Sequence, residues 1–282
     1  MRQRLRPLLP RFIALCAVIA GLSCSPAAAA GPRIVLGAGG DPAPWRAMLE
    51  RLVHGPEIAS VTLLVTSAAR TAALCGAGQS CYDHDAQTIV TSGTAPPGYT
   101  VAEIVAHEYG HHVAARRRNA PWDAYDWGTK RWASYEGVCA GVAAGRLFPG
   151  DQGAHYAENP GEAFADAYRM LNGGRGASPF DPRLAPDATS LALLRQDIEH
   201  PWRGPATLRR SIVAPARVTV DTELDGAFTA TAPGRHLRIL DAATGRVLGS
   251  GRSRAGARIC GQDAVTVAVS GRGHVRLRMT RP

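Results

Sequence analysis

The stretch TVAEIVAHEYGHHVAA, residues 100–115, decides the fold of this chain. Thr100 followed three residues later by Glu103 is the capping-box pattern that starts a helix. Apolar residues recur at helical spacing through the stretch, and the Asn-Ala-Pro sequence at 119–121 is typical of a helix end. The sequence therefore predicts a long helix that begins after Thr100.

This predicted helix carries the pattern His-Glu-Tyr-Gly-His at residues 107–111. His107 and His111 are four residues apart, so they share one face of the helix and can bind the same zinc ion. Glu108 stands beside them, where its carboxylate can take a proton from water and deliver it to a leaving amine. His112 is turned about 100° away from His111, and we expect it to be a packing residue or a residue that supports a metal ligand.

A catalytic zinc site of this type needs a third protein ligand. The segment ENPGEAFADAYR, residues 158–169, places Glu162 and Asp166 four residues apart on a second predicted helix. Glu162 is therefore the expected third ligand. Asp166 is expected to accept a hydrogen bond from the far ring nitrogen of a ligand histidine, which fixes the tautomer.

The two motifs together carry a family resemblance. HExxH followed by a helical E-x-x-x-[DE] pattern resembles the gluzincin metalloproteases, the class that includes thermolysin. The second segment, from Asn159 to Arg169, is similar to the catalytic domain of anthrax lethal factor-like peptidases. This resemblance covers about residues 55–200 and implies that Glu162 binds zinc. It also implies an upstream tyrosine that stabilises the oxyanion, for which Tyr156 is the nearest match and His155 the alternative donor.

A second resemblance leaves the third ligand open. Residues 107–113 followed by Glu136-Gly-Val-Cys-Ala-Gly-Val, residues 136–142, are similar to a bacterial neutral zinc metallopeptidase family. In that family an acidic residue stands just before the cysteine, where this chain has Val138. Glu136 is therefore an alternative ligand to Glu162, or a carboxylate on a helix face. His84, between two aspartates, is expected on a loop rim near the substrate or without a role.

The first thirty residues have the pattern of a secretory signal peptide. An arginine-rich start, an apolar run at 12–22 and alanines before Gly31 predict cleavage and a secreted or periplasmic protein. No later stretch is expected to span a membrane. Four cysteines then remain: Cys75 and Cys81 flank a short loop and are expected to form a disulfide bond, which leaves Cys139 to pair with Cys260. Alternatively, Cys139 is a small buried apolar residue.

The sequence changes character after Pro205. Segments 217–221, 236–239, 264–269 and 274–279 alternate apolar with polar residues, which predicts a small antiparallel, β-sandwich-like domain over 206–282. Residues 207–282 hold 13 arginines and 5 acidic residues. Such a domain is suited to bind an anionic cell-surface polymer. The alternative is that the arginines only form the solvated surface of the β-sheet. Because no aromatic residues stand among the arginines, nucleic acid is not an expected partner.

The fold class that follows is α+β: a zincin-like domain over 31–205, with the HExxH helix packed on a small sheet, and the β domain after it. Strands are expected near 34–36, 61–66 and 87–91, and helices near 45–53, 131–147, 160–171 and 189–198. Strand 87–91 is expected to pair with an extended peptide substrate. The predicted function is that of an exported zinc endopeptidase, a hydrolase. The alternatives are an inactive zinc-binding adhesin or scaffold, and a zinc amidase that acts on cell-wall peptides.

Overall fold

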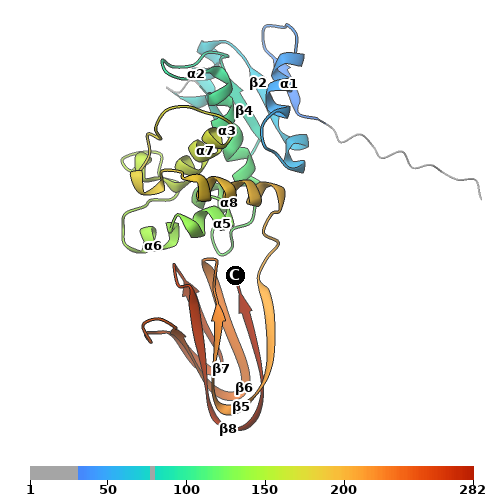
Figure 1. Cartoon of the computed structure of the whole chain (residues 1–282). Helices are drawn as coiled ribbons and strands as arrows, with labels where there is room; N and C mark the ends of the chain where they lie inside the picture. The colour runs from blue at the N-terminus through green and yellow to red at the C-terminus, as the bar shows by residue number, and fades with distance from the viewer. Residues whose placement is uncertain (1–30, 77–79) are drawn as a thin grey trace, which may run out of the picture. The chain divides into compact units, whose positions relative to one another are not determined.

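The structure is a computed structural model that describes residues 31–76 and 80–282 (Figure 1). The predicted signal peptide, residues 1–30, lies outside the described residues. Residues 31–282 form one compact unit with two separate hydrophobic clusters, one among the helices and one in the C-terminal sheet. The α+β fold class is confirmed. Within the described ranges, no helix has the length and apolar character needed to cross a membrane.

The N-terminal sheet has the strand order β1-β2-β4-β3, in which β3 alone is antiparallel to its neighbour. The prediction that strand 87–91 offers an edge to substrate is wrong. This segment, β4, hydrogen-bonds β2 on one side and β3 on the other. The edge strand beside it is β3, which the sequence did not predict. The strands are β1 (Arg33–Leu36), β2 (Thr62–Val65), β3 (Ser80–Asp83) and β4 (Thr88–Thr91).

The helices pack against this sheet and against one another. Thr100 Oγ1 accepts a hydrogen bond from the Glu103 N–H, and Glu103 Oε2 accepts one from the Thr100 N–H, so the predicted capping box is confirmed. The elements are α1 (Ala43–Glu50), η1 (Pro56–Ser60), α2 (Ala68–Cys75), α3 (Val101–Ala115), α4 (Ala124–Trp127), α5 (Lys130–Tyr135), α6 (Val138–Ala143), η2 (Tyr156–Glu158), α7 (Pro160–Leu171), η3 (Pro182–Leu184) and α8 (Ala188–Glu199).

Helices α3 and α7 approach each other closely at Gly110. A Cβ atom on Gly110 would lie 2.9 Å from Ala165 Cα and 3.0 Å from Tyr168 Cβ, so only glycine fits there. The buried rings of Tyr109 and Tyr168 pack across the same contact, with centroids 5.7 Å apart. This contact places the first turn of α7 opposite the HExxH motif of α3.

The predicted helix 131–147 is two short helices. Gly137 adopts a left-handed conformation, with φ 64°, between α5 and α6. An L-residue with a side chain rarely adopts that φ, so glycine both ends the first helix and redirects the chain. Trp132 of α5 is fully buried against Phe164 of α7, with ring centroids 5.2 Å apart.

Four long antiparallel strands form the C-terminal sheet, in the order β5-β8-β6-β7. The predicted segments 264–269 and 274–279 are two halves of one strand, β8, whereas β7 was not predicted because its small and charged residues hide the alternation. The strands are β5 (Ala206–Asp221), β6 (Gly226–Asp241), β7 (Val247–Ile259) and β8 (Ala264–Arg281).

The pairing register shows that β8 bends back on itself. Asp221 of β5 is opposite Ala264, and Thr229 of β6 is opposite Thr280. A straight strand would separate Ala264 from Thr280 by about 53 Å. The chain from Asp221 to Thr229 reaches at most about 29 Å. Both halves of β8 contribute buried side chains to one hydrophobic cluster, so the single sheet folds into two layers around it.

Glycines let the two halves of β7 meet directly. A Cβ atom on Gly249 would lie 2.0 Å from the carbonyl oxygen of Gly256, and one on Gly251 would lie 2.1 Å from that of Arg254. Between them, Ser253 has a positive φ of 63°. The backbone therefore leaves no room for a side chain where β7 folds back on itself.

We expect Gly249→Ala to destabilise the chain. Because the atom in the way belongs to the backbone, the strand must move, and we expect the free energy of unfolding to fall by about 3 kcal/mol. Gly256→Ala is the matched control, since a Cβ there would meet its nearest atoms at 3.9 and 4.0 Å. Chemical denaturation of both variants measures the difference, and equal stabilities would contradict the fold-back.

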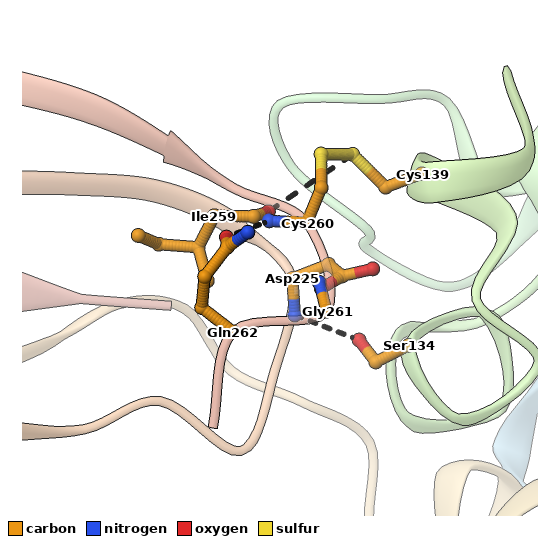
Figure 2. The surroundings of a disulfide bond; sticks show 7 residues. All are labelled: Ser134, Cys139, Asp225, Ile259, Cys260, Gly261 and Gln262. Atoms are coloured by element: carbon orange, nitrogen blue, oxygen red, sulfur yellow. Dashed lines mark hydrogen bonds between the residues drawn. A yellow bond between two sulfur atoms is a disulfide. The ribbon is translucent and has the colours of Figure 1, made fainter. Parts of the chain in front are cut away.

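Both predicted disulfide bonds are present, Cys75–Cys81 and Cys139–Cys260. Figure 2 shows that Cys139 on α6 reaches Cys260, just after β7. Close by, Ser134 Oγ accepts a hydrogen bond of 2.9 Å from the Asp225 N–H. The second disulfide therefore joins the helical part covalently to the C-terminal sheet. Two disulfide bonds fit an extracellular protein.

Candidate metal centre

The structure brings the three predicted ligands together from two helices. His107 and His111 lie one turn apart on α3, and Glu162 lies in the first turn of α7. Glu162 Oε2 is 3.3 Å from His107 Nε2 and 3.4 Å from His111 Nε2. One ligand atom from each residue lies within 4.8 Å of the others, a group that can hold a metal ion.

The charges within this group favour an ionised glutamate. Burial works against ionisation of Glu162, but hydrogen bonds with His107 and His111 outweigh it and hold the pKa of the carboxyl well below its usual range. Burial also works against protonation of His107, yet Glu162 and Glu108 raise the pKa of that imidazole. The site is thus a negative carboxylate facing two imidazoles, which is the charge pattern that a cation satisfies.

Glu108 is buried beside the two histidines, with 8% of its surface exposed. Burial raises the pKa of its carboxyl above the usual range, although the neighbouring histidines oppose this effect. The backbone of Tyr82, on the edge strand β3, also lowers the pKa of this carboxyl in part.

Two further side chains hold Glu162 from the segment before α7. The Tyr156 hydroxyl donates to Glu162 Oε2 at 3.0 Å, so the structure places Tyr156 beside the ligands. Gln152 Nε2 donates to Glu162 Oε1 at 2.8 Å. The sequence does not predict this role of Gln152, because a single glutamine in a loop belongs to no spacing pattern.

Asp166 makes a different contact from the one expected. Its Oδ1 accepts a hydrogen bond of 2.7 Å from Arg169 Nε, one turn along α7. Its Oδ2 and His111 Nδ1 are both buried and, among the described residues, have no hydrogen-bond partner. The predicted hydrogen bond from a ligand histidine to Asp166 is therefore not formed in this structure: Arg169 on the same helix bonds Oδ1, and Oδ2 stays without a partner among the described residues.

His112 is a packing residue, as expected. It is fully buried, with Nδ1 2.9 Å from the Tyr82 hydroxyl and Nε2 3.0 Å from the Glu57 carbonyl oxygen. Burial lowers the pKa of this imidazole, which matches a neutral ring. The contacts fasten α3 to the edge strand and to η1, where the Glu57 carboxylate also pairs with Arg117 at 2.8 Å.

The alternative ligand Glu136 lies outside the metal group. It follows α5, and burial raises the pKa of its carboxyl to about 7. The alternative donor His155 is exposed and stacks on Phe148 at 3.8 Å. His84 stacks on Tyr125 at 5.0 Å.

Aromatic side chains surround the ligands. The Phe180 ring stacks on His107 at 6.2 Å, and Tyr125 lies 5.7 Å from the His111 ring. Burial, followed by the charges of Glu162 and Glu108, raises the pKa of Tyr125 to about 12, so this hydroxyl stays protonated. A cavity of about 330 Å³ opens beside the ligands, lined by Ser80, Pro96, Tyr99, Ile104, His107, Glu108, Tyr156, Asp166, Arg169, Pro179 and Phe180.

The arrangement thus combines three side chains that could hold a metal ion with a buried carboxylate and a phenol. His107, Glu108 and Tyr156 of this set line one cavity. No protein-family model, curated protein or solved structure matches the chain.

Proposed function

We propose that this chain is an exported zinc-dependent endopeptidase. The observation that carries the proposal is the convergence of His107, His111 and Glu162 within 4.8 Å, with Glu108 next to them on α3. Two imidazoles and one carboxylate are the donor set of catalytic zinc sites that keep one position open for water. The two disulfide bonds support an extracellular location.

Zinc in such a site would polarise a peptide carbonyl and lower the pKa of a water molecule. His107, His111 and Glu162 would hold it, and Gln152 would keep the Glu162 carboxylate oriented through its bond to Oε1. A buried carboxyl whose pKa is raised is suited to move protons near neutral pH. Glu108 therefore takes the proton from the attacking water and passes it to the leaving amine.

The Tyr156 hydroxyl is placed to stabilise the developing oxyanion. It reaches Glu162 Oε2 at 3.0 Å, and burial, followed by the Glu162 charge, raises the pKa of the phenol. The phenol therefore stays protonated and can donate a hydrogen bond where negative charge develops.

The test combines metal analysis with hydrolysis of two substrates. We expect about one zinc per chain and cleavage of unfolded casein. A chelator should abolish this cleavage, and added zinc should restore it. Purified peptidoglycan is the second substrate. Cleavage of peptidoglycan without casein would show an amidase in place of an endopeptidase, and zinc binding without either activity would support a scaffold.

Tyr156→Phe is expected to lower kcat by about 100-fold, because it removes one hydrogen-bond donor to the oxyanion. The zinc content and the KM should change little. Tyr135→Phe is the matched control: it also removes one tyrosine hydroxyl, but that hydroxyl donates to Asp187 at 2.7 Å, outside the metal group. An unchanged kcat in Tyr156→Phe would remove the tyrosine from the mechanism.

A further inference from the structure

The C-terminal sheet carries a row of four residues, three of them arginines, that crosses all four strands. Arg209 of β5 is opposite Arg278 of β8, which is opposite Thr231 of β6, which is opposite Arg254 of β7. Residues opposite each other in an antiparallel sheet have side chains on the same face. The three arginines of the row are exposed, so their guanidinium groups share one solvent-facing surface.

The neighbouring positions extend this surface with more arginine and with hydroxyl groups. Side chains two residues apart along a strand also share a face. Arg276, two residues from Arg278, and Arg258, four residues from Arg254, therefore join the three arginines, together with Ser211, which is opposite Arg276. We call this set the arginine face; its members are Arg209, Arg254, Arg258, Arg276, Arg278, Thr207, Ser211, Thr229, Thr231 and Thr280.

The arginine face has no carboxylate of its own. Segments 206–214, 226–231, 254–259 and 273–281 contain no aspartate or glutamate. The five acidic residues of the sheet stand at strand ends and turns: Asp221, Glu223, Asp225, Asp241 and Asp263. Across residues 31–76 and 80–282, no ion pair or side-chain hydrogen bond engages any of the five guanidinium groups.

Like charges directly opposite each other destabilise a sheet. Here Arg278 has Arg209 opposite it and Arg276 two residues along the strand. Two hollows meet at this residue, one of about 420 Å³ beside Arg209 and Arg276, and one of about 200 Å³ beside Thr231 and Arg254. An anion seated there would relieve the repulsion and accept hydrogen bonds from both sides.

We propose that the arginine face binds a linear polymer that carries repeated phosphate groups. Guanidinium groups match phosphate oxygens in two-pronged hydrogen bonds. Their spacing, about 5 Å across strands and about 7 Å along them, suits a chain with several charges more than one free anion. The face bears hydroxyls between its arginines and no aromatic residue, so it offers neither stacking for nucleobases nor an apolar wedge for a membrane.

The test measures binding of medium-length inorganic polyphosphate to the full chain, as a function of salt. We expect binding that weakens with salt. The variant with Arg209, Arg254 and Arg278 all changed to Gln should lose affinity at least about tenfold, and the slope of log affinity against log salt should fall by about 2. Changing the same three residues to Lys should give an intermediate loss, because the charge stays but the two-pronged bond is lost.

The matched control changes Arg217, Arg238 and Arg246 to Gln. It removes the same charge from exposed positions outside the arginine face, and we expect less than a threefold loss of affinity. Orthophosphate and vesicles that contain anionic phospholipid should bind weakly. The proposal is overturned if the control loses as much affinity as the test variant, or if single-stranded DNA or the vesicles bind more tightly than polyphosphate. None of these measurements depends on peptidase activity.

Discussion

Glu162→Ala should lose bound zinc, because it removes one of three ligand side chains. Glu162 Oε2 lies within 3.4 Å of both histidine Nε2 atoms, and among the described residues no other carboxylate belongs to this group. Removing a residue that only hydrogen-bonds a metal ligand already lowers metal affinity about 10–100-fold. Because Glu162 is itself a proposed ligand, we expect the loss here to exceed about 100-fold. Zinc titration against a competing chelator measures it, and casein hydrolysis should fall in parallel.

Glu136→Ala is the comparison that decides between the two candidate third ligands. Glu136 lies outside the metal group, with one carboxylate oxygen buried and without a hydrogen-bond partner among the described residues. We expect this variant to keep its zinc and its activity. The opposite pattern, with zinc lost in Glu136→Ala and kept in Glu162→Ala, would refute the proposed site.

The parts of the fold that could be predicted are those that depend on residues close together in the sequence. The capping box at Thr100 and Glu103 and the apolar spacing fixed the start and face of α3, since they depend only on residues within a few turns. The same local periodicity located α7 with its predicted bounds. Because both helices were correctly placed, the histidines and Glu162 could be assigned to one group before their distances were known.

Other features depend on contacts between distant residues. No local pattern shows that β4 pairs on both sides or that β3 supplies the edge, since strand order is set by long-range pairing. The fold-back of the C-terminal sheet is likewise visible only in the register between β5, β6 and β8. Its sequence signature is a set of glycines near the strand middles, and glycine there is equally typical of ordinary turns.

At the site, the sequence did not predict which side chains would bond the carboxylates of Asp166 and Glu162. Spacing alone placed Asp166 on the correct face of α7, but it could not show that Arg169, three residues later, would bond the carboxylate at 2.7 Å. Gln152 reaches Glu162 from a loop ten residues away. Such choices follow from rotamers and loop conformation, which the pattern of residue types does not record.

Glu108→Gln should slow peptide hydrolysis strongly while leaving the metal centre intact. The substitution keeps the size of the side chain but removes the group that accepts and returns a proton, so we expect kcat to fall by about 10²–10⁴-fold. Zinc content should not change, because Glu108 is outside the ligand group. Single-turnover hydrolysis of a labelled peptide, with zinc measured on the same sample, separates the chemical step from metal loss.

The matched control for this variant is Glu199→Gln on α8. It makes the same chemical change at an exposed residue whose one ion pair within the described ranges is with Arg195, at 3.5 Å, and we expect wild-type activity. If Glu108→Gln cleaves casein as fast as this control, water is activated by another group and the mechanism fails, even with zinc bound. If Glu108→Gln also loses its zinc, Glu108 contributes to metal binding. A protein that needs Glu108 to hydrolyse peptides but not to bind zinc would have the division of roles that the geometry supports.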